Sequence, residues 1–273
     1  MHVFPLSFAE FMQVYSGNAY DGCTYGGLPM TLAMQTDGQK AAYLKLLFDE
    51  TYLKDIVERN SVGKPQALKE LIDVMASCTG TLTNPTKIAD TFKRRLNSGI
   101  TVNTVRTYIG YLQEAFLLTA AHRFDVKGRK YIGTPHKHYF EDVGQRNARL
   151  QFRQFEEKHL MENVIFNELR LRGFDVDVGC VNQRSVQDGK RLGKQLEVDF
   201  VANQGSRRIY IQSAFRLPDE EKLRQEKASL LAIRDAFKKL IIVGHPIKAT
   251  YDQDGIYYMS IFDFLLKSDS LLW

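Results

Sequence analysis

The stretch LEVDFVANQGSRRIYIQSAF, from Leu196 to Phe215, decides the fold. Its first half alternates apolar and polar residues, and a period of two predicts a β-strand. This alternation places Glu197 and Asp199 together on one face of the strand. The polar residues in the middle predict a turn, and a second strand follows with Gln212 and Ala214 on one face. The sequence therefore predicts a β-hairpin that carries acidic and amide side chains.

The residues around this hairpin predict a mixed α/β region from about residue 148 to the end. The expected helices cover residues 155–172, 218–237 and 261–267, and the expected strands cover 174–179, 196–202, 209–215, 240–243 and 256–259. Gly173 is expected to stop the first helix. Residues 182–195 are polar and basic and predict a long mobile loop. The order α-β-β-β-α-β resembles the core of the restriction-endonuclease-like fold.

That resemblance implies a catalytic site on the hairpin. The fold places an acid on one strand and an acid, a spacer and a lysine on the next. Glu162, Asp199 and Gln212 are the matching candidates for catalytic positions. Because Gln212 replaces the second acid and Ala214 replaces the lysine, we expect a degenerate site without activity. Glu162 and Asp199 remain candidate ligands for a weakly bound Mg²⁺, which prefers anionic oxygen ligands. The alternative is that both carboxylates are structural and bond to backbone groups or arginines.

Residues 61–147 predict a winged-helix domain. Helices are expected over residues 66–77, 85–95 and 101–118, and the third carries an apolar stripe that includes Val105 and Phe116. A hairpin that turns at Lys127 and Gly128 follows the third helix. Arg106 lies on the polar side of that helix, where a recognition helix faces DNA. Many such modules contact only protein, and this alternative stays open.

Charge is concentrated in the same segment. Residues 61–142 contain 12 Lys and Arg and 7 Asp and Glu, so this segment carries the whole formal net charge of +5. A polyanion such as DNA is the expected partner of a basic segment. The candidate nucleic-acid-binding residues are Lys93, Arg94, Arg95, Arg106, Lys127, Arg129 and Lys130.

Composition places the chain among globular proteins. It has 273 residues, of which 44% are hydrophobic and 25% charged. No apolar run approaches the roughly 20 residues that a membrane span requires, and the N-terminus lacks signal-peptide character. Three widely spaced cysteines without CxxC spacing predict a cytoplasmic protein without a disulfide framework. We therefore expect no membrane partner.

Several further motifs resemble the C-terminal half of a family of bacterial and archaeal AAA-type ATPases. The matching stretches span nearly the whole chain and are PLSFAEF, YGGLP, YLKDIVER, TVNTVRTYIGYLQEAFLL, KHYFEDVGQRN, ENVIFNELRLRGFDVDVG and EVDFVA. The resemblance implies a winged helix followed by a nuclease-like domain of unknown function. It also implies that an ATPase module, missing here, or another protein is a partner.

The sequence contains no GxxxxGK[ST] phosphate-binding loop. ATP is therefore expected only for a full-length relative, and this chain needs no cofactor unless the nuclease-like site is active and holds Mg²⁺.

The fold class that we expect is α+β. Residues 1–60 form a helical connecting region, 61–147 a winged helix and 148–273 an α/β restriction-endonuclease-like domain. The expected function is DNA or partner-protein binding by the non-ATPase portion of such an ATPase. The alternatives are a divergent Mg²⁺-dependent DNA nuclease and a protein-interaction module that regulates an ATPase.

Overall fold

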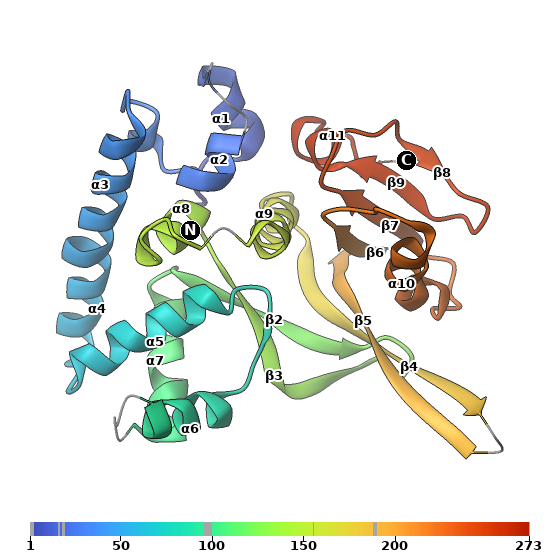
Figure 1. Cartoon of the computed structure of the whole chain (residues 1–273), viewed down its shortest axis with the longest axis horizontal. Helices are drawn as coiled ribbons and strands as arrows, with labels where there is room; N and C mark the ends of the chain where they lie inside the picture. The colour runs from blue at the N-terminus through green and yellow to red at the C-terminus, as the bar shows by residue number, and fades with distance from the viewer. Residues whose placement is uncertain are drawn as a thin grey trace. The chain divides into compact units, whose positions relative to one another are not determined.

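The chain folds into mixed α and β structure, which a computed structural model describes for residues 3–15, 17, 20–95, 100–154, 156–187 and 190–272 (Figure 1). Two compact units make up the chain. The first unit comprises residues 1–120 and 134–164, and the second comprises residues 121–133 and 165–273. The domain boundaries expected near residues 60 and 147 are a different division and stay a prediction.

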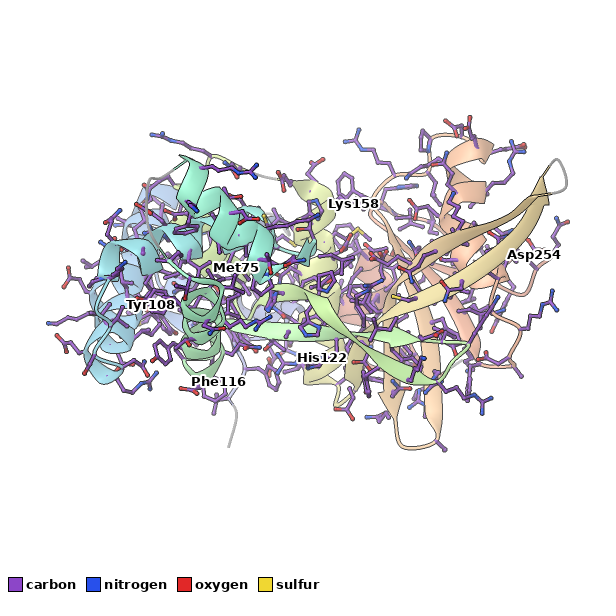
Figure 2. The ribbon with its side chains drawn as sticks, turned by 90° about the horizontal axis from the view of Figure 1, so that it is seen from below. Met75, Tyr108, Phe116, His122, Lys158 and Asp254 are labelled. Atoms are coloured by element: carbon purple, nitrogen blue, oxygen red, sulfur yellow. The ribbon has the colours of Figure 1, made fainter. Side chains whose placement is uncertain are left out.

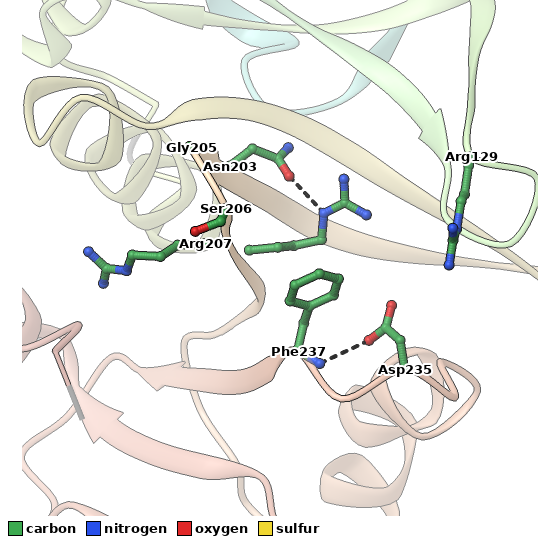
Figure 3. A pocket seen from close by; sticks show the side chains of 8 residues that line it. Arg129, Asn203, Gly205, Ser206, Arg207, Asp235 and Phe237 are labelled. Carbon is green, nitrogen blue, oxygen red and sulfur yellow. Dashed lines mark hydrogen bonds between the residues drawn. The ribbon is translucent and has the colours of Figure 1, made fainter.

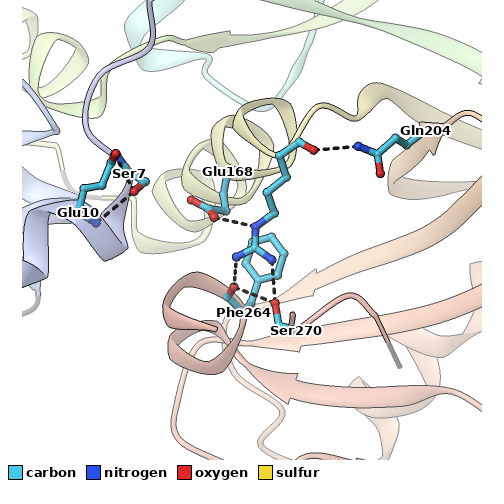
Figure 4. A network of polar contacts seen from close by, with 7 residues as sticks. Ser7, Glu10, Glu168, Gln204, Phe264 and Ser270 are labelled. Carbon is cyan, nitrogen blue, oxygen red and sulfur yellow. Dashed lines mark hydrogen bonds and ion pairs between the residues drawn. The ribbon is translucent and has the colours of Figure 1, made fainter. Parts of the chain in front are cut away.

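The first unit is mostly helical. Its helices are α1 (Phe8–Val14), α2 (Tyr20–Tyr25), the 3₁₀-helix η1 (Pro29–Thr31), α3 (Asp37–Leu47), the π-helix η2 (Phe48–Leu53), α4 (Lys54–Arg59), α5 (Pro65–Ser77), α6 (Pro85–Arg95), α7 (Val102–Glu114) and α8 (Val143–Arg149). Ser7 caps α1 by accepting the Glu10 amide, while the Glu10 carboxylate accepts the Ser7 amide (Figure 4). Such reciprocal caps satisfy amides that have no partner inside the helix.

The three helices expected from residues 66 to 118 are present as α5, α6 and α7. Asn84 caps α6 by accepting the Thr86 amide at 2.9 Å, and Thr101 caps α7. The apolar stripe of α7 packs into a core that these three helices share, and its buried members include Val105, Ile109 and Leu112. The expected end of this helix at residue 118 is wrong, because α7 ends at Glu114. Phe116, which was expected in the apolar stripe, has a φ of 54° and is 57% exposed (Figure 2).

The expected hairpin joins β2 (Leu118–Asp125) to β3 (Lys130–Phe140), and its turn lies at Lys127 and Gly128. In the first unit, β3 pairs antiparallel with the short strand β1 (Leu82–Thr83), which the sequence pattern did not indicate. In the second unit, β2 pairs in parallel with β4 (Asp175–Gln187). The two ends of this hairpin therefore belong to different units.

The second unit is built on a sheet that continues from β4 through β5 (Lys190–Gln204), β6 (Arg207–Ala214), β7 (Lys238–Val243) and β9 (Tyr257–Ser260) to β8 (Thr250–Tyr251). The β4–β5, β5–β6 and β9–β8 pairs are antiparallel, whereas β6–β7 and β7–β9 are parallel. The hairpin expected at residues 196–215 is confirmed as β5 and β6, with Gln204 paired to Arg207 and Gly205 at a φ of 59° in the turn.

Residues 182–187 and 190–195 are not a loop. They form the outer part of the β4–β5 hairpin, in which Asn182 pairs with Gln195 and Gln187 with Lys190. Side chains such as Gln183 and Lys194 are exposed. A strand that is exposed on both faces has no period-two pattern of apolar residues, so the sequence pattern did not reveal it.

Helices pack against both faces of this sheet. Helix α9 (Glu157–Leu171) ends at Gly173, which has a φ of 81°, and its Phe166 lies 6.4 Å from the Phe200 ring. Helix α10 (Glu220–Leu231) packs on β5 and β6, where its Leu230 joins the core of Val201 and Tyr210. Because Phe200 and Val201 are consecutive in a strand, α9 and α10 cover opposite faces. Helix α10 is shorter than the expected span of 218–237.

The end of the second unit is held by Arg172. Its Nε atom donates to Glu168 at 2.7 Å, and its terminal nitrogens donate to the Ser270 hydroxyl and to the carbonyl of Phe264, which lies in α11 (Ile261–Leu266) (Figure 4). Within the described ranges, no helix is long and apolar enough to cross a membrane.

Candidate functional site

The β5–β6 pair brings Asp199 and Gln212 together in the second unit. Phe200 pairs with Ile211, so the preceding residue of β5 and the following residue of β6 are neighbours that share a face. Asp199 is 4% exposed and Gln212 is 9% exposed. The sequence pattern predicted this juxtaposition, and the structure confirms it.

Two hydrogen bonds link these neighbouring residues. The Asp199 Oδ2 atom accepts the Ser213 amide at 2.8 Å. The Asp199 amide in turn donates to the Gln212 Oε1 atom at 3.4 Å. Part of the Asp199 carboxylate therefore takes the place of a missing backbone partner in the sheet, as the structural alternative predicted.

Helix α10 adds a carboxylate to this pair. The Gln212 Nε2 atom donates to the Glu226 Oε2 atom at 3.1 Å, and the Ser229 hydroxyl donates to Gln212 Oε1 at 3.4 Å. Glu226 is 7% exposed. At its outer side, its Oε1 atom lies 2.7 Å from the Nζ atom of Lys222, whose side chain is 41% exposed.

The sequence analysis missed Lys222, Glu226 and Ser229. Their spacing at i, i+4 and i+7 is the signal that marks one face of a helix. We define Asp199, Gln212, Glu226, Ser229 and Lys222 as the β5–α10 cluster.

The β5–α10 cluster links two buried acidic residues through one neutral amide. Gln212 accepts the Asp199 backbone amide and donates its N–H to the Glu226 carboxylate, which satisfies one oxygen of that acid. In the ranges that the structure describes, no group of three or more His, Cys, Asp and Glu side chains is arranged to hold a metal ion. The arrangement can bind a polar group or position a proton, and it carries one lysine at its edge.

Position 214 is part of the apolar core of the second unit. Ala214 is 2% exposed and packs in the cluster that contains Tyr210, Leu230 and Val243. A lysine at this position would bury a charge among apolar groups, which is costly without a partner. The nearby lysine of the β5–α10 cluster is Lys222, and it reaches Glu226 from α10.

Glu162, the third candidate of the nuclease-like site, belongs to the first unit. Its Oε2 atom lies 3.3 Å from the Nζ atom of Lys137, and both side chains are at least 96% buried. Lys137 comes from the KHYFEDVGQRN motif on β3. Glu162 therefore has a structural ion pair inside its own unit, and its participation with Asp199 in one metal site stays a prediction.

The candidate nucleic-acid-binding residues are divided between the units. Lys93 and Arg94 lie on α6 and Arg106 on α7, and the side chains of all three are exposed. In the part of the chain that the structure describes, none of the three forms an ion pair or a side-chain hydrogen bond. The Arg95 side chain lies outside the described residues.

The other candidates lie at the tip of the β2–β3 hairpin, in the second unit. The Asp125 carboxylate accepts the amides of Lys127 and Gly128 and fixes the turn. Lys127 donates through Nζ to the Asn182 carbonyl at 2.8 Å. Arg129 and Lys130 are exposed and form no ion pair within the described ranges.

The motif around Asp142 holds the N-terminal segment of the first unit. Asp142 caps α8 by accepting the Gln145 amide at 2.9 Å, and its other oxygen accepts the Gly27 amide at 2.7 Å. Asn147 donates to the Thr24 carbonyl at 2.8 Å. Burial raises the pKa of Asp142 from 3.8 to about 6, although these amides act in the opposite direction.

Comparisons with known proteins give a family and distant relatives. A family model described as a domain of unknown function, DUF8612, matches residues 18–156. An uncharacterized protein of Haemophilus influenzae is 30% identical over 274 residues, which cover 97% of this chain and 64% of the relative. Uncharacterized protein MJ1544 of Methanocaldococcus jannaschii is 27% identical over 277 residues, which cover 96% and 59%.

The chain thus spans less than two thirds of the length of these relatives. A crystal structure of protein VC1899 from Vibrio cholerae aligns with 98% of this chain and 60% of its own, at 10% identity and a TM-score of 0.28. These relatives are longer proteins, so any activity of a whole relative is a matter of proposal for this chain.

Proposed function

The chain belongs to the DUF8612 family, a domain of unknown function, and we propose that it binds DNA through a winged helix in residues 61–147. The observation that carries this proposal is a set of exposed basic side chains on α6 and α7 of the first unit, Lys93, Arg94 and Arg106, that have no acidic partner among the described residues. Exposed cations without partners are the groups that neutralise phosphates and release counterions.

The order of elements supports the winged helix. A short strand, β1, lies between the first and second helices and pairs with β3 of the hairpin that follows the third helix. The elements therefore follow the order α5, β1, α6, α7, β2 and β3, in which β2 and β3 would form the wing. Helix α7 exposes Arg106 and buries Val105 and Ile109, so its polar side is available to a DNA groove.

In this proposal the second unit contributes a nuclease-like layout without nuclease chemistry. Its elements follow the order α9-β4-β5-β6-α10-β7, as in the restriction-endonuclease-like core that the sequence resembles. The Gln212 amide stands where the family places an acid, and Ala214 stands in an apolar core. We therefore expect this unit to stabilise or dock rather than to cut.

One observation favours a second candidate, a Mg²⁺-dependent DNA nuclease. Glu226 brings a second buried carboxylate to Gln212, which is the neighbour of Asp199 on the adjacent strand. Lys222 adds a lysine at the edge of the same cluster. A hard cation would take oxygens from Asp199 and Glu226 only if Gln212 turned its carbonyl toward it. Metal-dependent cleavage that is lost in both Asp199→Asn and Glu226→Gln would favour this candidate over the first.

A third candidate is an interaction module for an ATPase, because the sequence resembles the C-terminal half of AAA-type ATPases. ATP binding would then reside in a partner or in a part of a relative that this chain does not cover. Duplex binding separates this candidate from the first, since a module that only contacts protein has no salt-dependent affinity for DNA.

The test of the leading proposal is fluorescence anisotropy with a labelled 20-base-pair duplex. The triple variant Lys93→Gln, Arg94→Gln, Arg106→Gln removes exposed charges from α6 and α7 and should bind at least tenfold more weakly. The control triple variant Lys54→Gln, Arg59→Gln, Arg153→Gln removes the same charge from other exposed positions of the first unit. If both triple variants lose affinity equally, the binding follows net charge and not the winged helix.

A further inference from the structure

A pocket of about 290 Å³ opens in the second unit (Figure 3). It lies between the β5–β6 turn, the segment after α10 and the tip of the β2–β3 hairpin. Its lining includes Arg129, Asn203, Ser206, Arg208, Asp235 and Phe237. Its volume is close to the lower end of small-ligand sites, which is about 300 Å³. The pocket thus suits a small ligand.

Arg208 is held in place at this pocket. Its Nε atom donates to the Asn203 Oδ1 atom at 2.7 Å. The guanidinium lies over two aromatic rings, 5.2 Å from the centroid of Phe124 and 5.3 Å from that of Phe237. A stacked and hydrogen-bonded guanidinium loses little further entropy when it binds an anion.

Arg129 reaches the pocket from the hairpin tip (Figure 3). Its backbone has a φ of 49°, an uncommon conformation for a residue with a side chain. The side chain is exposed and forms no ion pair or hydrogen bond within the described ranges. The turn that carries it is fixed by Asp125, so a charged group stands at the pocket without a protein partner.

Asp235, an acidic residue in the pocket lining, accepts hydrogen bonds from neutral groups. Its Oδ2 atom accepts the Tyr210 hydroxyl at 2.6 Å, and its Oδ1 atom accepts the Phe237 amide at 3.2 Å. No arginine forms an ion pair with it in the described part of the chain. Arg207 donates through its guanidinium to the Leu271 carbonyl at 2.9 Å. Both Asp235 oxygens therefore accept hydrogen bonds from neutral groups, while Arg129 and Arg208 line the same pocket.

The remaining wall is aromatic. Phe237 is 41% exposed although it is a large apolar side chain. The exposed Phe237 ring offers a surface on which a base can stack. The guanidiniums of Arg129 and Arg208 offer N–H donors for phosphate oxygens. We propose that this pocket binds a nucleoside monophosphate unit, with its phosphoryl group between Arg129 and Arg208 and its base against Phe237. This binding site goes beyond duplex binding and does not depend on it.

Isothermal titration calorimetry of the whole chain tests this proposal with AMP, UMP, adenosine and inorganic phosphate. We expect both nucleotides to bind and adenosine to bind at least tenfold more weakly than AMP. Arg129→Gln and Arg208→Gln should each weaken AMP binding about tenfold. Phe237→Ala should weaken AMP but leave inorganic phosphate unchanged. The control Arg234→Gln removes an exposed arginine that lies close in sequence but does not line the pocket, and it should bind as the wild type does.

A 5′-phosphorylated trinucleotide distinguishes a strand end from a free nucleotide. Tighter binding than AMP, lost when the 5′-phosphate is removed, identifies a strand terminus, and equal or weaker binding identifies a free nucleotide. No binding of either nucleotide at millimolar concentration, or wild-type affinity in Arg129→Gln, would overturn the proposal. The Arg129 side chain forms no hydrogen bond or ion pair among the described residues, so its variant should fold even if Arg208→Gln does not. Lys93, Arg94 and Arg106 stay intact here, so this test and the duplex test can fail separately.

Discussion

The Gln212 side chain on β6 donates a hydrogen bond to Glu226 on α10 at 3.1 Å, between buried groups. Because this amide accepts the Asp199 backbone N–H and donates to the Glu226 carboxylate, its replacement by an acid tests what the β5–α10 cluster does. Gln212→Glu removes the donor and adds a like charge, and it should lower the free energy of unfolding by about 1–3 kcal/mol. Urea unfolding measures this loss.

The exchanged pair Gln212→Glu, Glu226→Gln is the matched control, because it restores one amide and one carboxylate. It should recover most of the lost stability. In the single variant, a cation that takes oxygens from three acids should also restore stability, so 10 mM Mg²⁺ should raise its unfolding midpoint but not that of the wild type. A Gln212→Glu variant as stable as the wild type would show that the bond to Glu226 contributes nothing.

The ion pair of Lys137 and Glu162 should be essential to the first unit. Both side chains are buried, so Glu162→Gln removes the Glu162 charge from beside a buried ammonium and should cost about 3–5 kcal/mol. The double variant Lys137→Met, Glu162→Leu should cost less than that single variant. For comparison, Arg59→Gln breaks an exposed pair with Asp55 and should cost under about 1 kcal/mol. A Glu162→Gln variant that unfolds like the wild type would contradict the structural role.

Asp142 should make stability depend on pH. Its pKa is raised by burial from 3.8 to about 6 in the folded state, so folding favours the protonated carboxyl. Stability should therefore fall as the pH rises from about 4 to about 6 and should level off above that, by about 3 kcal/mol in total. Asp142→Asn lacks this titration. Urea unfolding at several pH values should show a difference between the two proteins that shrinks as the pH rises; a constant difference would exclude the raised pKa.

The chain by itself should not hydrolyse ATP. The sequence has no phosphate-binding loop, whose backbone amides and lysine hold a triphosphate. Equilibrium dialysis with labelled ATP and a phosphate-release assay both measure this. Micromolar affinity together with turnover would contradict the expectation. Weak ATP binding that Arg129→Gln abolishes would instead be assigned to the pocket at the hairpin tip.

The sequence predicted those parts of the fold that have a clear apolar period. The β5–β6 hairpin, the helix α6 and the stop of α9 at Gly173 are present as expected. The outer β4–β5 hairpin was predicted as a loop, because its exposed faces leave no apolar alternation. The strand β1 has only two residues, and its pairing with β3 depends on residues more than fifty positions away.

The candidate site was predicted only in part. Asp199 and Gln212 lie side by side because apolar and polar residues alternate along each strand and because the two strands pair within one hairpin. Glu226 and Lys222 approach this hairpin through the packing of α10 on the sheet, which depends on tertiary contacts that a local pattern does not contain. The same holds for the Lys137 partner of Glu162, which is 25 residues away along the chain.

Phosphate contacts by the winged helix are the central feature of the proposed DNA binding, and the salt dependence of duplex binding measures them. For each phosphate contact, the slope of log affinity against log salt is about −0.9. The triple variant Lys93→Gln, Arg94→Gln, Arg106→Gln should therefore flatten the slope by about 3 relative to the wild type, whereas the control triple variant at positions 54, 59 and 153 should keep the wild-type slope. An unchanged slope in the first variant, or no salt-dependent binding by the wild type, would contradict the proposal that this chain binds DNA through its winged helix.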